Sequence, residues 1–263
     1  MVEPKKKVVL IGAGNLGTQL AKALNRSKHD LVQICSQNET SAKLIAQKLP
    51  YTSYGSVKDI EQDADIYIIA TNDASIAKVA RDLSLGNKMV VHTSGTVDMK
   101  VLRPASSRIG VLYPVQTFTR DINVDFKNIP LCLEANSVTA LTMLKHFARP
   151  LSNNLYEIDS NKRKTIHLAA VFVNNFTNHM YSIAHALLSE NNSSLDILRP
   201  LITETARKVN ENIPEKMQTG PATRGDHDTM LAHIKLLEGH KDYQEIYKLL
   251  SQSIIHSTIT NNK

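Results

Sequence analysis

The chain of 263 residues contains no tryptophan, only two cysteines and 5% aromatic residues. Cys35 and Cys132 lie in separate apolar runs without CxxC or Cys/His spacing, so we expect buried thiols rather than a disulfide or a metal site. With so few aromatic side chains, the chain lacks the stacking platform that binders of single-stranded nucleic acid use. We therefore expect no metal and no nucleic-acid partner.

Long apolar runs are also missing, since none approaches the roughly 18 residues of a membrane-spanning helix. The first four residues precede three lysines and lack the apolar core of a secretion signal, so we expect a cytoplasmic protein without a membrane partner. The net charge of +6 comes from scattered basic residues whose only tight cluster is residues 5–7. Solubility and an anionic small-molecule partner account for this charge.

The most informative stretch present is residues 7–17, KVVLIGAGNLG. Its apolar half predicts a strand buried on both faces, and the pattern that follows predicts a helix packed against it. In this GxGxxG spacing, Gly12 allows a tight turn, Gly14 lets a pyrophosphate approach the backbone, and Gly17 lets the helix lie close to the strand. A second predicted strand argues against a turn without a ligand. We therefore predict a dinucleotide site at Gly12, Gly14, Asn15, Leu16 and Gly17.

Apolar runs alternate with helical patterns up to about residue 157. We predict strands at Val8–Ile11, Leu31–Cys35, Asp65–Ala70, Lys88–His92, Arg108–Leu112, Ile129–Leu133 and Asn154–Ile158. This alternation predicts a mostly parallel sheet covered on both faces, as in a Rossmann-like α/β domain. Later residues show only helical patterns, at 162–189, 194–210, 226–237 and 243–258. The predicted domains are an α/β Rossmann domain at residues 1–157 and an all-α domain at residues 158–263.

The end of the second predicted strand bears on the choice of dinucleotide. NAD sites usually have an Asp or Glu there for the ribose hydroxyls, but this chain has CSQN at residues 35–38 and no acid before Glu39. Ser36 and Asn38 can donate hydrogen bonds to a 2′-phosphate, Gln37 stands near the usual place of an arginine, and Lys43 can add charge. The sequence favours NADP(H), with NAD(H) as the alternative.

Polar residues follow three further strands, where ligands of open α/β sheets bind. After the third and fourth predicted strands, we expect cofactor contacts from Thr71, Asn72, Thr93, Ser94 and Gly95. Asp73 is equally suited to cap a helix, and His92 is expected to be a core histidine rather than a catalytic one. The motif Tyr113-Pro114-Val115-Gln116-Thr117-Phe118 places Gln116 at the substrate.

The helix predicted at residues 162–189 carries one polar stripe. At about 100° per residue, its polar side chains fall within an arc of roughly 80° while most of the other positions are apolar and expected to be buried. The stripe consists of Lys164, His167, Asn175, Asn178, Ser182 and His185. Lys164 or His167 can supply a proton, and Asn175 and Asn178 can orient a substrate. The alternative is a polar seam satisfied by neighbouring helices or at a dimer interface.

A turn rich in glycine and proline, TGPATRGD at residues 219–226, precedes a later helix. Its backbone N–H groups and the Arg224 side chain can hold a substrate carboxylate. The alternative is a shaped turn in which Asp226 caps the helix.

These motifs together resemble the Rossmann-like proteins with a DUF2520 C-terminal domain. The resemblance rests on the glycine-rich turn, HTSG at 92–95, YPVQTF at 113–118, HLAAVF at 167–172 with Asn175, and TGPATRGD at 219–226. That family is similar in architecture to pyrroline-5-carboxylate reductase, ketopantoate reductase and 6-phosphogluconate dehydrogenase. The resemblance implies an all-α domain like the C-terminal one of 6-phosphogluconate dehydrogenase, NADP-linked reduction of a small carboxylate-bearing substrate, and a homodimer formed through that domain.

The chain departs from these families at two places. Many DUF2520 proteins have His where this chain has Tyr113. Ketopantoate reductases have a Lys followed by Asn four and eight residues later, but counted from Lys164 those positions are Leu168 and Phe172.

We predict an NADP(H)-dependent oxidoreductase that moves hydride between nicotinamide and a C=O or C=N carbon. The alternative is a non-catalytic NADP(H)-sensing protein that binds a protein partner.

Overall fold

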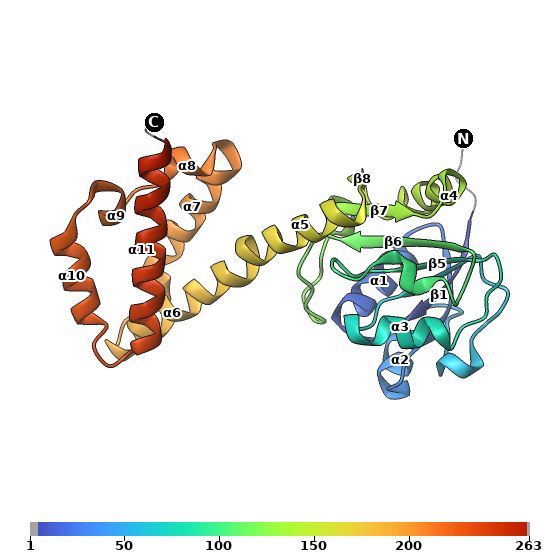
Figure 1. The fold of residues 1–263 in the computed structure, drawn as a ribbon. Helices are drawn as coiled ribbons and strands as arrows, with labels where there is room; N and C mark the ends of the chain where they lie inside the picture. Colours follow the sequence, from blue (N-terminus) through green and yellow to red (C-terminus); the bar gives the residue numbers. More distant parts are fainter. Residues whose placement is uncertain (1–4, 262–263) are drawn as a thin grey trace. The chain divides into compact units, whose positions relative to one another are not determined.

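The computed structural model describes residues 5–261 (Figure 1). Contacts along the chain divide it into two units, residues 1–175 and 176–263. The first unit contains an eight-stranded sheet with the order β3-β2-β1-β4-β5-β6-β7-β8. Its strands are β1 (Lys7–Ile11), β2 (Asp30–Cys35), β3 (Ser53–Gly55), β4 (Ile66–Ile69), β5 (Met89–His92), β6 (Arg108–Pro114), β7 (Leu131–Ala135) and β8 (Leu155–Glu157).

The sheet is parallel except between β6 and β7, which pair antiparallel. All seven predicted strands are present, with ends shifted by at most two residues. The edge strand β3 was not predicted, because its sequence SYG has no apolar run and its side chains are not buried. The Rossmann-like α/β prediction is confirmed.

Helices cover both faces of the sheet (Figure 1). They are α1 (Asn15–Arg26), α2 (Glu39–Ala46), α3 (Asp73–Arg81), α4 (Val138–Ala148) and α5 (Ser160–Ala170), with short 3-10 turns η1 (Val57–Asp59), η2 (Met99–Leu102) and η3 (Phe126–Asn128). Val8 and Leu10 pack with α1, α2 and α4 on one face, while Val9 and Ile11 pack with α3 and η2 on the other. Burial on both faces explains the continuous apolar strands. Cys35 and Cys132 are buried free thiols, as predicted.

A fully buried arginine fixes α5 to the sheet. Arg163 forms an ion pair with Glu134 of β7 at 3.1 Å, and its guanidinium also donates to the Ser94 carbonyl at 2.9 Å. Breaking a buried, hydrogen-bonded ion pair typically costs about 3–5 kcal/mol. The start of α5 is therefore held beside the end of β5. The domain boundary predicted at 157/158 stays a prediction.

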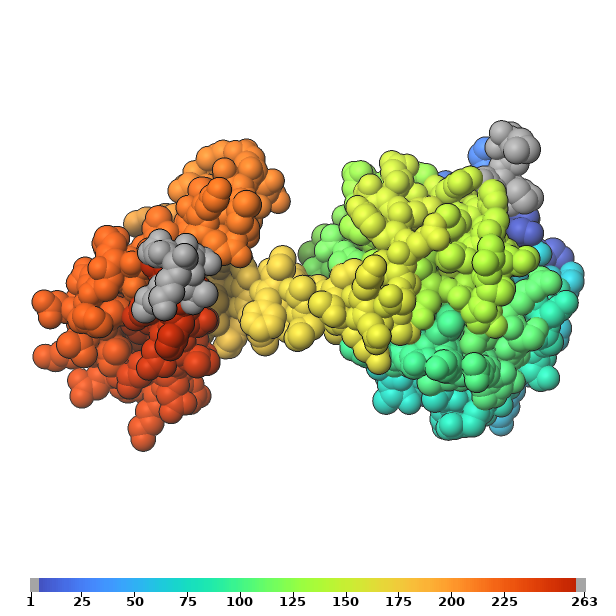
Figure 2. Space-filling model, turned by 45° about the horizontal axis from the view of Figure 1, so that its top comes forward, coloured from blue at the N-terminus to red at the C-terminus, as the bar shows by residue number. Residues whose placement is uncertain are grey.

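The single helix predicted at residues 162–189 is interrupted. It consists of α5, a π-helical segment η4 (Val171–Phe176) and α6 (Thr177–Glu190). The expectation that its apolar positions are buried is wrong for a single chain, because Leu168 is 59% and Val173 75% exposed. Figure 2 shows the α5 part of this stretch in yellow, with no other segment in front of it on the face in view.

The second unit is helical, as predicted. Besides α6, it contains η5 (Leu195–Leu198), α7 (Arg199–Glu211), α8 (Pro214–Met217), α9 (Pro221–Arg224), α10 (His227–Leu236) and α11 (Lys241–Asn261). Asp226 caps α10 by accepting a hydrogen bond from the Thr229 N–H at 3.1 Å. In residues 5–261, no helix combines the length and apolar composition needed to cross a membrane.

Apolar burial is distributed unequally between the two units. The three clusters of buried apolar side chains all lie in the first unit. Among the described residues of the second unit, the buried apolar side chains are only those of Ala222, Met230 and Leu237, each still 8% exposed. The second unit therefore lacks a substantial core within one chain.

Candidate functional site

The glycine-rich turn has the shape that its spacing predicts. Gly12 has φ +123°, and a Cβ there would lie 2.3 Å from the Ala70 carbonyl oxygen. A Cβ on Gly17 would lie 2.1 Å from the Gly12 carbonyl oxygen, whereas a Cβ on Gly14 would meet nothing within 4 Å. Gly14 is the N-cap residue of α1 and provides no side-chain cap. The first N–H groups of α1 therefore suit an anion such as a pyrophosphate.

A cavity of about 640 Å³ opens on one side of this turn, and we call it the β2-end cavity. Its lining includes Gly12, Gly14, Ser36, Gln37, Thr71 and Asn72 from the prediction, together with Ser56, Lys58, Ser75, Lys78 and Asp82. These residues follow β1, β2, β3 and β4, lie on α3 or, for Asp82, form its C-cap. The carboxyl ends of four parallel strands thus form one concave surface, as expected for a nucleotide.

Two residues predicted near the 2′-phosphate, Asn38 and Lys43, have other partners, and the cap that Asp73 was suited to form comes from its neighbour. The Asn38 side chain caps α2 by accepting from the Ser41 N–H at 3.2 Å, and it does not line the β2-end cavity. The Lys43 ammonium lies 5.9 Å from the centre of the Tyr54 ring. Asn72, rather than Asp73, caps α3.

The residues at the end of β5 do not line the β2-end cavity. His92 is fully buried, and its Nδ1 accepts a hydrogen bond from the Ser94 N–H at 3.1 Å. Burial, reinforced by the Arg163 charge, lowers the pKa of His92 to about 4. Thr93 and Ser94 are buried, and the Ser94 hydroxyl accepts from the backbone N–H groups of Thr96 and Val97. His92 is thus a neutral core histidine at pH 7, as expected.

A second cavity of about 540 Å³ lies beside α5, and we call it the α5 cavity. It brings together five predicted residues: Asn15, Leu16, Gln116, His167 and Asn175. The β2-end cavity includes Gly12 to Gly14 and the α5 cavity includes the next two residues. The two cavities therefore lie on either side of one glycine-rich turn.

The α5 cavity contains a hydrogen-bonded pair of titratable side chains. The Tyr113 hydroxyl lies 3.1 Å from His167 Nδ1, and the two rings meet edge to face. Burial raises the pKa of Tyr113, so its phenol stays protonated at neutral pH. Gly95 lies against His167, because a Cβ there would be 2.5 Å from Nδ1. Only glycine at position 95 leaves room for this imidazole.

The structure does not group every predicted site residue. Lys164 lies on α5, but its side chain is exposed and does not line the α5 cavity. Asn178 lies on α6 and Arg224 at the end of α9, both exposed and both in the second unit. The roles of these three residues stay predictions.

The sequence interpretation missed several contacts. Tyr113 was given no role, although it contacts His167. Ser56 and Lys58 follow β3, so recognising that short strand would have placed them at the β2-end cavity. Arg120 donates to the Ala13 carbonyl at 3.0 Å. No sequence signal identified that contact, because Arg120 lies in an irregular loop.

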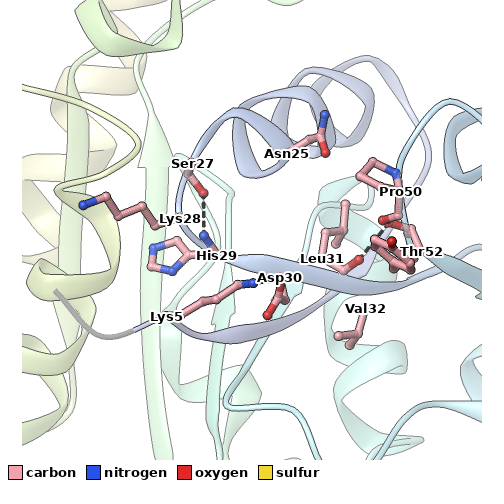
Figure 3. Close-up of a pocket in the computed structure, with 11 residues that line it drawn as sticks. Lys5, Asn25, Ser27, Lys28, His29, Asp30, Leu31, Val32, Pro50 and Thr52 are labelled. Carbon is pink, nitrogen blue, oxygen red and sulfur yellow. Dashed lines mark hydrogen bonds and ion pairs between the residues drawn. The ribbon is translucent and has the colours of Figure 1, made fainter. Parts of the chain in front are cut away.

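A larger cavity, of about 790 Å³, lies elsewhere on the first unit (Figure 3). It is lined by Lys5, His29, Asp30 and Thr52 among others, around the starts of β1, β2 and β3. Lys5 and Asp30 form an ion pair at 2.6 Å in it. Because ligands of open α/β sheets bind at the carboxyl ends of the strands, we do not take it as the main site. In residues 5–261, no group of three His, Cys, Asp or Glu side chains is arranged for a metal ion.

Comparisons with known proteins agree with this architecture. Residues 1–115 match the Rossmann-like domain model and residues 129–254 match the domain of unknown function DUF2520. A candidate NADP oxidoreductase from Bacteroides fragilis has 42% identity and a TM-score of 0.89, with 96% of this chain and 98% of that chain covered. The chain belongs to the Rossmann-like DUF2520 family. Among the curated proteins, none matches it.

Two more distant solved structures share the fold of this DUF2520 protein. The imine reductase from Myxococcus stipitatus, in complex with NADP⁺, has 13% identity and a TM-score of 0.64 over 97% of this chain and 94% of that chain. The 1-pyrroline-5-carboxylate reductase from Streptococcus pyogenes has 15% identity and a TM-score of 0.62 over 97% and 98%.

Proposed function

We propose that this DUF2520 protein is an NADP(H)-dependent oxidoreductase that reduces a C=O or C=N carbon of a small metabolite. The observation that carries the proposal is the pair of cavities that flank the glycine-rich turn. On this proposal the adenosine end of the coenzyme lies in the β2-end cavity and the nicotinamide end in the α5 cavity. The Bacteroides fragilis relative and the two reductases support this class of reaction.

The bound coenzyme would supply the hydride, and the protein would position it and handle the proton. The α1 N–H groups and Gly14 would hold the pyrophosphate, as the uncapped helix start fits an anion. Gln116 and Asn175 would orient the substrate in the α5 cavity. Asn178 and Arg224 remain our candidates for the substrate carboxylate.

We assign the proton donor to His167 rather than Lys164. His167 lines the α5 cavity, whereas the exposed Lys164 does not. In the imidazolium form of His167, Nδ1–H would donate to the Tyr113 oxygen and Nε2–H would protonate the oxyanion or amine, which leaves a neutral imidazole with its proton on Nδ1. Tyr113 would thus orient His167 and set its tautomer.

The test is NADPH oxidation with a panel of small keto acids and cyclic imines. His167→Ala should lower kcat about 100-fold or more, the usual contribution of a general acid. Tyr113→Phe should lower kcat less and shift its pH profile, since the ring stays but the hydroxyl partner is lost. Lys164→Ala, on the same helix, is the control and should keep wild-type turnover.

Equal turnover in wild type and His167→Ala would remove His167 as the proton donor. Coenzyme binding without turnover of any compound in the panel would instead favour the sensor alternative.

We also propose that the protein is a homodimer formed through its helical unit. That unit buries very few apolar side chains within one chain, and Ile197, Leu201 and Leu249 are exposed. A second copy supplies a surface of the same character that can cover them. A cytoplasmic location remains our prediction.

A further inference from the structure

We infer that Lys58, from the turn after β3, binds the 2′-phosphate and sets the preference for NADP(H). The inference rests on the proposed function, because it concerns the adenosine end of that coenzyme. The residues after β2 provide no arginine for this role, and the Lys43 ammonium lies near the Tyr54 ring. A cation from another element is therefore needed to balance a dianionic 2′-phosphate.

Strand pairing places the Lys58 turn beside the end of β2. The strands β2 and β3 pair in parallel with Cys35 opposite Gly55, and the Ser36 N–H donates to the Gly55 carbonyl at 3.1 Å. The residues after each strand therefore emerge together at one edge of the sheet. Both Ser36 and Lys58 line the β2-end cavity.

Hydrogen bonds within η1 define the start of that turn. The Ser56 hydroxyl accepts from the Lys58 N–H at 3.2 Å and donates to the Asp59 carboxylate at 2.8 Å. Asp59 therefore has a hydrogen-bond partner on its own turn. The Lys58 side chain is exposed and forms no ion pair with any residue in the described range 5–261.

Lys78 is the other lysine of the β2-end cavity, but its position suits the 2′-phosphate less well. It lies on α3, four residues before Asp82, which lines the same cavity. That helix follows β4, whereas the Lys58 turn follows β3, the strand that pairs with β2. Ribose hydroxyls are recognised at the end of β2, where Ser36, Gln37 and the Lys58 turn meet.

The test measures equilibrium binding of NADPH and NADH to the full-length protein. Lys58→Met keeps most of the aliphatic chain but removes the charge, so NADPH should bind about tenfold more weakly while NADH binding is unchanged. Binding of 2′,5′-ADP should fall similarly, and binding of 5′-AMP should not. Lys43→Met, outside the cavity, is the matched control and should keep the NADPH to NADH ratio of the wild type. Lys78→Met tests the competing lysine of the cavity and should keep that ratio as well.

An unchanged ratio of NADPH to NADH affinity in Lys58→Met, including an equal loss for both coenzymes, would overturn the inference. A fall in this ratio in Lys43→Met or Lys78→Met instead would also overturn it. Failure of wild type to bind either coenzyme would instead overturn the proposed function. Circular dichroism checks that each exposed-lysine variant is folded.

Discussion

His92 illustrates how burial of one side chain makes the first unit sensitive to acid. It has no exposed surface, and its pKa falls from 6.5 to about 4 in the folded chain. Arg163 disfavours the imidazolium, while Asp73 and Asp98 partly favour it. Above pH 6.5 neither the folded nor the unfolded state protonates this histidine. Between pH 6.5 and 4 only the unfolded state binds the proton, so the free energy of unfolding decreases as the pH is lowered through this range.

We predict that His92→Asn removes part of this acid sensitivity. The asparagine oxygen can replace Nδ1 as the acceptor for the Ser94 N–H but does not titrate. Between pH 7 and 4.5, wild type should lose about 2 kcal/mol more unfolding free energy than the variant. Urea unfolding at both pH values measures the difference. The same loss in both proteins would show that His92 takes up its proton in the folded state.

Single residues were predictable where their neighbours in sequence define their surroundings. His92 is the last residue of an apolar strand, so its burial was expected. The pairing of Tyr113 with His167 was not, because 54 residues separate them and no sequence periodicity relates a position on β6 to one on α5. Gly95 was predicted as a cofactor contact, but its close approach is to His167.

At the scale of elements, the glycine-rich turn permits a prediction that separates folding from coenzyme binding. The Gly14 backbone is extended, and an added Cβ would meet no protein atom within 4 Å. Gly14→Ala should therefore keep the wild-type Tm but weaken NADPH binding at least about tenfold, because a methyl group would displace the pyrophosphate.

Gly17→Ala is the contrasting variant. Its Cβ would lie 2.1 Å from the Gly12 carbonyl oxygen, so the strand and α1 must separate. We expect a loss of about 1–3 kcal/mol in unfolding free energy, seen as a lower Tm. If Gly14→Ala bound NADPH as well as wild type does, the coenzyme would not lie against this turn.

The sequence predicted the elements of the sheet better than the long helix. Strands buried on both faces are continuous apolar runs, so their boundaries were visible. The helical wheel for residues 162–189 assumed an uninterrupted α-helix, but η4 is π-helical. A π segment has i to i+5 hydrogen bonds and changes the angular position of every later side chain. Lys164 therefore need not share a face with Asn178.

At the scale of the whole molecule, the few buried apolar residues of the helical unit lead to a prediction about assembly. Leu201 of α7 is 62% exposed, and we expect the second copy to cover it. Leu201→Glu should shift the protein from dimer to monomer, because a charge would be buried at the interface. Sedimentation velocity at micromolar concentration measures the shift.

Thr203→Glu is the matched control, because it adds the same charge about 200° around the helix from Leu201. Thr203 is exposed, and its hydroxyl donates only to the Arg199 carbonyl of its own helix among the contacts described for it. The dimer proposal would fail if wild type sedimented as a monomer, or if Leu201→Glu sedimented like Thr203→Glu.

The unequal apolar burial of the two units also has a consequence for refolding. The first unit contains all three clusters of buried apolar side chains, so it can fold from one chain at a rate independent of protein concentration. On the homodimer proposal, the helical unit gains its missing apolar contacts only when two chains collide. Its amide protons should therefore gain protection from exchange in a later, second-order phase that quickens as more protein is added.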